Sequence, residues 1–210
     1  MGLTYQAAYY LTRAVAHCCF DFRVVNREAI PKDGGLLLAM NHQSFIDPPL
    51  AGIACDRDVS YLARKSLMDV PILGKLLPAL NVIPYDQSGS DIGALKALIR
   101  AVKHGKAAVI FPEGTRTPNG ELQPAQGGIG MVVAKTLVPV VPMRIFGAFD
   151  AFPRNSKKVR LSQVTLVVGE VLQFTAADCE GDPRLVYKRL SNTVMEAITA
   201  LRCPPRNGCA

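Results

Sequence analysis

The stretch that decides the fold is residues 36–48, which read LLLAMNHQSFIDP. Its first five residues are all apolar, a pattern typical of a strand buried in a domain core. Pro48 and Pro49 at the far end favour the start of a new helix directly after Asp47. The stretch therefore predicts a buried strand at residues 36–40 that passes through a short polar loop into a helix at about 49–54.

The polar loop places a histidine and a carboxylate five positions apart, His42 and Asp47. If the chain turns sharply, Asp47 accepts a hydrogen bond from one ring nitrogen of His42, which fixes the tautomer and leaves the other nitrogen as a general base. The nearest hydroxyl, Ser44, lacks the Gly-x-Ser-x-Gly turn that exposes a nucleophilic serine. Such a pair also occurs by chance, so the spacing alone leaves a structural role open. If His42 is a base, the group that it activates arrives with the substrate.

Outward from this loop, short apolar runs alternate with stretches of helical periodicity. Strands are predicted at residues 20–27, 36–40, 59–64, 82–85, 107–111, 138–146 and 159–171, and helices at 3–20, 49–54, 71–80, 91–104, 125–135 and 182–201. This alternation predicts an α/β fold: a single mixed, mostly parallel sheet flanked by helices, with an N-terminal amphipathic helix. We divide the chain into that helix at residues 1–20, one domain at 21–202 and a flexible tail at 203–210.

The N-terminal helix has one wide apolar face, but Arg13 and His17 are among the polar residues that interrupt it. It is therefore too polar to be predicted as a membrane span, and it lacks the positive start and cleavage site of a signal peptide. Two alternatives remain: a helix that lies in the headgroup layer of a membrane, or a helix packed on the domain.

The composition limits the class of partner. The chain has 210 residues, a net charge of +7 and no Trp. A basic balance suits nucleic acid, an anionic membrane or phosphorylated substrates, and the absence of a recognised nucleic-acid motif argues against the first. The six cysteines and three histidines show no metal-ligand spacing, so we expect no metal and a reducing compartment.

A second polar loop follows an apolar strand at residues 111–117, which read FPEGTRT. With residues 41–48, it closely resembles the first and third signature blocks of the glycerolipid acyltransferases, the lysophosphatidate acyltransferase or PlsC-like family. Residues 64–84 look like the second block and residues 138–142 like the fourth. The four blocks occur in the family's order, and the resemblance runs from about residue 20 to 172.

The resemblance implies an O-acyltransferase. It would move a fatty acyl group from a coenzyme A or carrier-protein thioester to the hydroxyl of a lysophospholipid, most directly 1-acylglycerol-3-phosphate, giving phosphatidate. We expect it to work without a cofactor and without an acyl-enzyme, peripheral or monotopic on the cytoplasmic face of a membrane, with an anionic surface as partner. The resemblance implies that His42 and Asp47 are catalytic, and that substrate is bound by Asn41, Arg64, Lys65, Glu113, Gly114, Thr115 and Arg116.

Three of these residues carry more specific predictions. Arg116 offers a planar fork for bidentate contact with phosphate. Glu113 is a poor phosphate ligand by charge, so we predict that it orients a hydroxyl or Arg116. Asn41 and the backbone N–H groups after the strands are candidates to stabilise the oxyanion.

Two positions depart from the family pattern, because Gln87 and Gln126 stand where cations are common. This weakens the prediction of a doubly charged phosphate monoester. It leaves open a lyso-aminolipid or another lysophospholipid as acceptor, or a catalytically idle module that binds lipid. The intact His42, Asp47 and Arg116 argue against the idle module.

Overall fold

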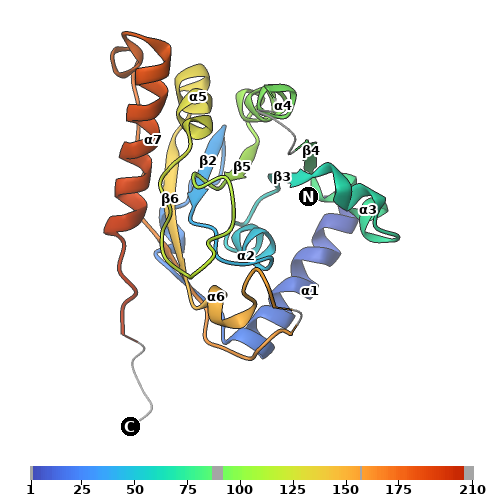
Figure 1. The fold of residues 1–210 in the computed structure, drawn as a ribbon. Coiled ribbons are helices and arrows are strands. Elements are labelled where there is room, and N and C mark those ends of the chain that lie inside the picture. The colour runs from blue at the N-terminus through green and yellow to red at the C-terminus, as the bar shows by residue number, and fades with distance from the viewer. Residues whose placement is uncertain (1, 87–91, 157, 206–210) are drawn as a thin grey trace.

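The computed structural model describes residues 2–86, 92–156 and 158–205 (Figure 1). Its strands form one seven-stranded sheet of order β1-β7-β6-β2-β5-β3-β4. They are β1 (Arg23–Val25), β2 (Leu36–Met40), β3 (Val59–Arg64), β4 (Val82–Tyr85), β5 (Ala107–Ile110), β6 (Val140–Phe146) and β7 (Thr165–Val168). The β6–β7 pair is antiparallel, and the other neighbouring pairs are parallel. The predicted single, mixed and mostly parallel sheet is confirmed.

Helices cover both faces of the sheet (Figure 1). They are α1 (Leu3–Phe20), α2 (Asp47–Ile53), α3 (Leu73–Leu76), α4 (Ile92–Lys103), α5 (Gly127–Thr136), α6 (Ala148–Ala151) and α7 (Pro183–Ala200), with 3₁₀ turns η1 (Arg27–Ala29), η2 (Lys65–Asp69), η3 (Leu77–Leu80) and η4 (Ala177–Cys179). Side chains of α1 and α2 join one core cluster, and those of α4, α5 and α7 join the other. The domain is therefore three layers thick.

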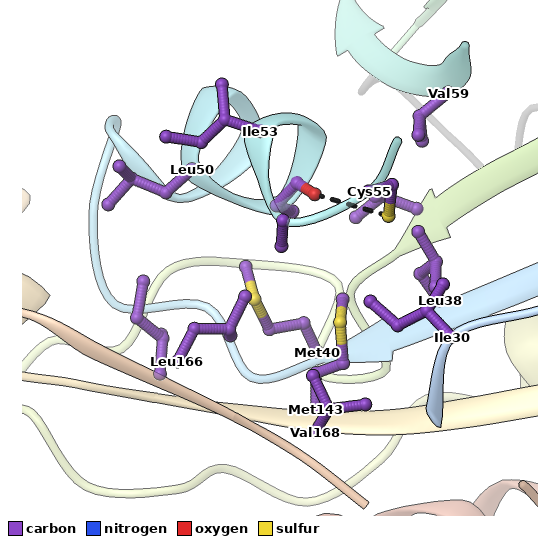
Figure 2. Close-up of a cluster of buried hydrophobic side chains, with 14 of the residues drawn as sticks. Ile30, Leu38, Met40, Leu50, Ile53, Cys55, Val59, Met143, Leu166 and Val168 are labelled. Carbon is purple, nitrogen blue, oxygen red and sulfur yellow. Dashed lines mark hydrogen bonds between the residues drawn. The ribbon is translucent and has the colours of Figure 1, made fainter. Parts of the chain in front are cut away.

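Strand β2 lies in the middle of the sheet and supplies both cores. Leu36, Leu38 and Met40 point into the cluster shared with α2, part of which is seen in Figure 2. Leu37 and Ala39 point to the opposite face, towards α4, α5 and α7. All five residues are completely buried, as expected for a parallel strand with both faces covered. The loop after Met40 therefore starts from a completely buried strand in the middle of the sheet.

Helix α1 combines features of both alternatives predicted for it. Tyr5, Tyr9, Ala16 and Phe20 are buried on the side that faces the domain, so the helix packs against it. A second set of apolar side chains points into solvent: Leu3, Tyr10, Leu11 and Val15. Among the described residues, no helix has the length and apolar character needed to cross a membrane.

Several predicted elements are shorter than expected. The predicted strand 159–171 is confined to β7, and Val159 and Leu161 lie exposed in the loop before it. The predicted helix 71–80 is divided into α3 and η3, and α6 was not predicted. Residues 206–210 of the predicted tail and Gln87 lie outside the described residues.

Candidate active site

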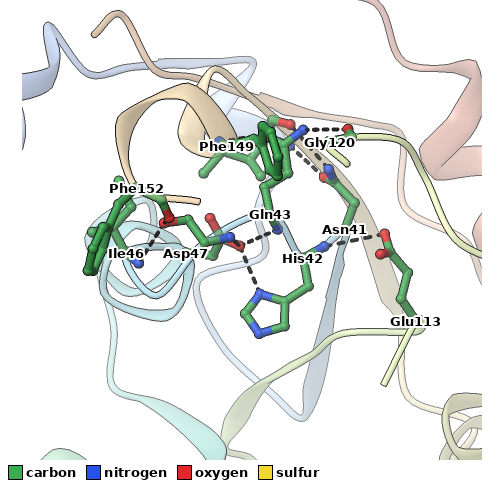
Figure 3. A network of polar contacts seen from close by, with 11 residues as sticks. Asn41, His42, Gln43, Ile46, Asp47, Glu113, Gly120, Phe149 and Phe152 are labelled. Atoms are coloured by element: carbon green, nitrogen blue, oxygen red, sulfur yellow. Dashed lines mark hydrogen bonds and ion pairs between the residues drawn. The ribbon is translucent and has the colours of Figure 1, made fainter. Parts of the chain in front are cut away.

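The loop between β2 and α2 brings the predicted histidine and carboxylate together (Figure 3). Nδ1 of His42 lies 2.8 Å from Oδ2 of Asp47. The same oxygen accepts the backbone N–H groups of Gln43 and Ser44, each at 2.6 Å. Asp47 is the first residue of α2, where the helix dipole favours a negative charge. The carboxylate therefore both holds the loop in its turn and binds the imidazole.

These contacts fix the chemistry of the histidine ring. Oδ2 of Asp47 is an acceptor, so Nδ1 of His42 carries the proton and Nε2 keeps its lone pair. The ring also stacks on Phe111, with centroids 3.9 Å apart and planes inclined by 18°. The side chain is 17% exposed, so it is held firmly and yet open to a ligand. The arrangement is that of an oriented general base.

Burial also affects the protonation of the acidic partner. The Asp47 side chain is completely buried, and its Oδ1 has no hydrogen-bond partner among the described residues. Burial raises the pKa of the Asp47 carboxyl, while the hydrogen bonds from His42, Ser44 and Gln43 act in the opposite direction.

The Glu113 carboxylate contacts the backbone of the loop that carries His42. Its Oε1 accepts the backbone N–H of His42 at 3.3 Å, and the carbonyl of His42 accepts the N–H of Thr117 at 2.8 Å. Burial raises the pKa of Glu113 to about 7, and Oε2 has no partner among the described residues. The sequence predicted that Glu113 orients Arg116 or a hydroxyl. In the structure Oε1 holds the backbone of the loop that carries His42, and the predicted orienting role stays a prediction.

The side-chain amide of Asn41 is also hydrogen-bonded within the protein. Its amide nitrogen donates to the Ile145 carbonyl at 3.2 Å, and its amide oxygen accepts the Ile145 N–H at 2.8 Å. The residue is 1% exposed. We therefore correct its predicted role in binding substrate or an oxyanion: Asn41 ties the end of β2 to β6.

Positive charge gathers beside the histidine. The guanidinium carbon of Arg116 lies 3.4 Å from the ring centroid of Phe45, and its Nη1 is buried with no partner among the described residues. Burial lowers the pKa of Arg116, and the neighbouring charges of Arg154 and Arg64 lower it further. Arg64 ends β3, and Lys65 is exposed next to it at the start of η2.

The other members of the second loop set its shape. Gly114 has φ +69°, and a side chain there would also press on Gln126 at 3.2 Å. The Thr115 hydroxyl accepts a hydrogen bond of 3.3 Å from Nη1 of Arg154. Arg154 lies in the loop after α6, and no pattern in the sequence pointed to it.

Three further contacts that the sequence did not predict fasten the histidine loop to the loop after β5 and to the region of α6. The Gln43 side chain donates to the Gly120 carbonyl at 3.2 Å and accepts the Phe149 N–H at 3.3 Å (Figure 3). The Ser44 hydroxyl donates to the Phe152 carbonyl at 2.7 Å. Ser44 is therefore a buried structural hydroxyl.

With this geometry established, similarity to known proteins becomes informative. A family model described as Acyltransferase matches residues 21–146, more than half of the chain. The chain belongs to this acyltransferase family. The match includes both polar loops and ends before α6, so Arg154 lies outside it.

Individual relatives agree with the family. The acyltransferase is 28% identical over 152 residues to the 1-acyl-sn-glycerol-3-phosphate acyltransferase of Bacillus subtilis, covering 71% of this chain and 73% of that protein. It is 31% identical over 141 residues to the chloroplastic 1-acyl-sn-glycerol-3-phosphate acyltransferase BAT2 of Brassica napus, covering 66% of this chain but only 41% of the plant protein. The crystal structure of PlsC from Thermotoga maritima shares the fold, with a TM-score of 0.77 and 24% identity over 95% of this chain and 81% of that one.

The candidate site thus has two parts. His42, Asp47 and Glu113 are joined by hydrogen bonds in a unit that presents one imidazole nitrogen. Arg116, with Arg64 and Arg154 nearby, forms a positive region beside it. Among the described residues, no three His, Cys, Asp or Glu side chains are placed to hold a metal ion.

Proposed function

We propose that this acyltransferase moves a fatty acyl group from an acyl thioester to the free hydroxyl of 1-acyl-sn-glycerol-3-phosphate, producing phosphatidate. The observation that carries the proposal is the oriented His42–Asp47 pair next to a positive region. The named activity of the bacterial and plant relatives supports the choice of acceptor.

In this mechanism Nε2 of His42 takes the proton of the acceptor hydroxyl as its oxygen attacks the thioester carbonyl carbon. The C–S bond then breaks, and the thiolate leaves as a thiol after it receives that proton from the imidazolium. Asp47 stabilises the imidazolium across the 2.8 Å contact. General-base assistance of this kind is worth about 10²- to 10⁴-fold in rate.

Transfer is direct in this proposal, without an acyl-enzyme. Ser44 is completely buried and donates its hydroxyl proton to the Phe152 carbonyl. Cys55 is buried, and burial raises the pKa of its thiol to about 12, so it carries almost no thiolate at neutral pH. Neither side chain is prepared to act as a nucleophile.

The positive region supports the proposal that the acceptor lipid has an anionic headgroup. The guanidinium of Arg116 offers two parallel N–H donors to phosphate, and its buried Nη1 lacks a partner among the described residues. The neutral Gln126 beside Gly114 favours a second candidate, the same reaction on a less charged lysophospholipid.

Membrane binding is a separate part of the proposal. The outward apolar side chains of α1, such as Leu11, lie on a helix that contacts η3. Just before η3, Ile72 precedes α3 and Leu76 ends it, and both are exposed. The chain carries a net charge of +7. We propose that this apolar surface rests in the headgroup layer at the inner face of a membrane, helped by anionic lipid.

The decisive experiment is a thiol-release assay with acyl-CoA, or with acyl-carrier protein, and a panel of acceptors. The panel contains lysophosphatidate, zwitterionic lysophospholipids and monoacylglycerol, and the lipid product is identified by mass spectrometry. We expect the best turnover with lysophosphatidate and at least a 100-fold loss in a folded His42→Ala variant. Lipid binding without thiol release for any acceptor would identify an idle module.

Vesicle pelleting tests the membrane surface. Leu11→Ser should weaken binding to anionic vesicles, whereas Leu185→Ser on α7 is a matched control on a different helix. The two leucines are 67% and 68% exposed. Equal vesicle binding by both variants would show that α1 does not contribute to the membrane-binding surface.

A further inference from the structure

The loop after α6 folds back onto both polar loops of the site. Its Phe152 accepts the Ser44 hydroxyl through the backbone, and its ring lies 5.7 Å from that of Phe45. Two residues further on, Nη1 of Arg154 donates to the Thr115 hydroxyl at 3.3 Å. The loop thus delivers a third arginine to the edge of the site from outside the region that the family model matches.

The position of Arg154 requires an explanation, because it adds charge where charge is already unbalanced. Arg154 and Arg64 both act on Arg116 as like charges. Like charges destabilise one another, and a bound anion removes that cost. Arg154 donates to the neutral hydroxyl of Thr115, and its side chain is exposed, so further guanidinium N–H groups face solvent.

The chemistry that matches two neighbouring guanidinium groups is a phosphate monoester. Such a group carries up to two negative charges and three acceptor oxygens, enough for one fork from each arginine. We propose that Arg154 binds the phosphate of the acceptor together with Arg116, and so supplies positive charge to a site in which Gln126 is neutral. This inference rests on the proposed function, since it names a further residue that binds the acceptor.

Coenzyme A also carries a phosphate monoester, so kinetics must separate acceptor from donor. Arg154→Gln should lower kcat/KM for lysophosphatidate about 10-fold, through KM, because a charge-assisted hydrogen bond at an exposed position is lost. The KM for acyl-CoA and the turnover of monoacylglycerol, which has no phosphate, should not change. Arg154→Lys should retain part of the effect.

Two further variants sharpen the test. Arg160→Gln removes an exposed arginine from the same loop and should leave all constants unchanged. Gln126→Lys in the Arg154→Gln background should recover part of the lost affinity, because Gln126 lies against Gly114 in the neighbouring loop. Both variants should melt within a few degrees of the wild type.

The outcomes separate this inference from the proposed function. If the wild type uses lysophosphatidate but Arg154→Gln keeps the same acceptor KM, the inference is wrong. A rise in acyl-CoA KM alone would also overturn it and assign Arg154 to the donor. If the wild type transfers no acyl group to lysophosphatidate, the proposed function fails. Calorimetric binding of lysophosphatidate to wild type and Arg154→Gln then decides the inference, because equal affinities would refute it.

Discussion

The contacts of Asp47 allow its charge to be separated from its structural role. Asp47→Asn removes the charge but keeps an oxygen. The N–H groups of Gln43 and Ser44, both at 2.6 Å, should turn that oxygen towards the loop and leave the amide NH₂ at the Oδ1 position. His42 would then keep the proton on Nδ1. Asp47→Ala, in contrast, removes the acceptor altogether.

The expected losses follow from these contacts. A carboxylate and an imidazolium with charge centres about 4 Å apart attract by about 4 kcal/mol at an effective dielectric constant of about 20. Part of this survives as a neutral hydrogen bond, so Asp47→Asn should cost roughly 2–4 kcal/mol in the barrier, about 30- to 900-fold in kcat. Asp47→Ala leaves the buried N–H of Ser44 without an acceptor, which should cost about 1–3 kcal/mol of stability, and the partly buried N–H of Gln43 adds a smaller cost. The alanine variant should therefore also be the less stable of the two.

Thiol release with saturating lysophosphatidate measures kcat, and urea unfolding followed by circular dichroism measures stability. Wild type, Asp47→Asn and Asp47→Ala should rank in that order in kcat, and Asp47→Ala should be the least stable of the three. The reasoning is wrong if folded Asp47→Asn retains more than about a tenth of wild-type kcat. It is also wrong if Asp47→Ala unfolds at the same urea concentration as the wild type.

Three other predictions address the second loop and the packing of the helices. Burial raises the pKa of Glu113 from its ordinary 4.5 to about 7, so the folded state binds the extra proton in this window. The contribution of Glu113 to stability should be fully present below pH 4.5 and be lost as the pH rises to 7, so Glu113→Gln should remove this part of the pH dependence in urea titrations at several pH values. An unchanged pH dependence would contradict the shift. Arg116→Lys should raise the acceptor KM about 10-fold without changing the donor KM, because an ammonium lacks the planar fork, and equal effects on both substrates would refute this. Gly130→Ala should lower the unfolding free energy by about 1–3 kcal/mol because its Cβ would lie 1.9 Å from the Tyr187 carbonyl, whereas Gly128→Ala has open space and should be neutral in the same thermal melts.

The elements of the fold were predictable where a local pattern determines them. The five apolar residues of β2 indicated a strand covered on both faces. Asp182 before Pro183 correctly marked the start of α7, and its side chain accepts hydrogen bonds from N–H groups in the first turn of that helix. The spatial order of the strands was not predictable, because it depends on packing between distant segments. Val159 and Leu161 continue an apolar alternation along the chain, yet they lie in a loop because the neighbouring strand pairs only from Thr165 onward.

The site divides in the same way. The His42–Asp47 contact was predictable because both residues belong to one turn. The role of Glu113 was not, since it depends on how two strand ends lie side by side in the sheet. The position of Arg154 could not be predicted from the sequence. It contacts Thr115, which lies 39 positions away in the chain, and no periodicity or motif marks it.

The short connection between β2 and α2 has a consequence for how this enzyme could diversify. The pair that we propose transfers the proton is contained within six consecutive residues, 42–47, whereas the arginines that we propose bind the headgroup come from separate segments of the chain. On this proposal, substitutions at Arg154 should alter which lipid is accepted while the ester-forming pair stays as it is. Engineering a new acceptor preference should therefore begin at Arg154 and keep Phe152, whose backbone carbonyl accepts the Ser44 hydroxyl and so supports the 42–47 turn.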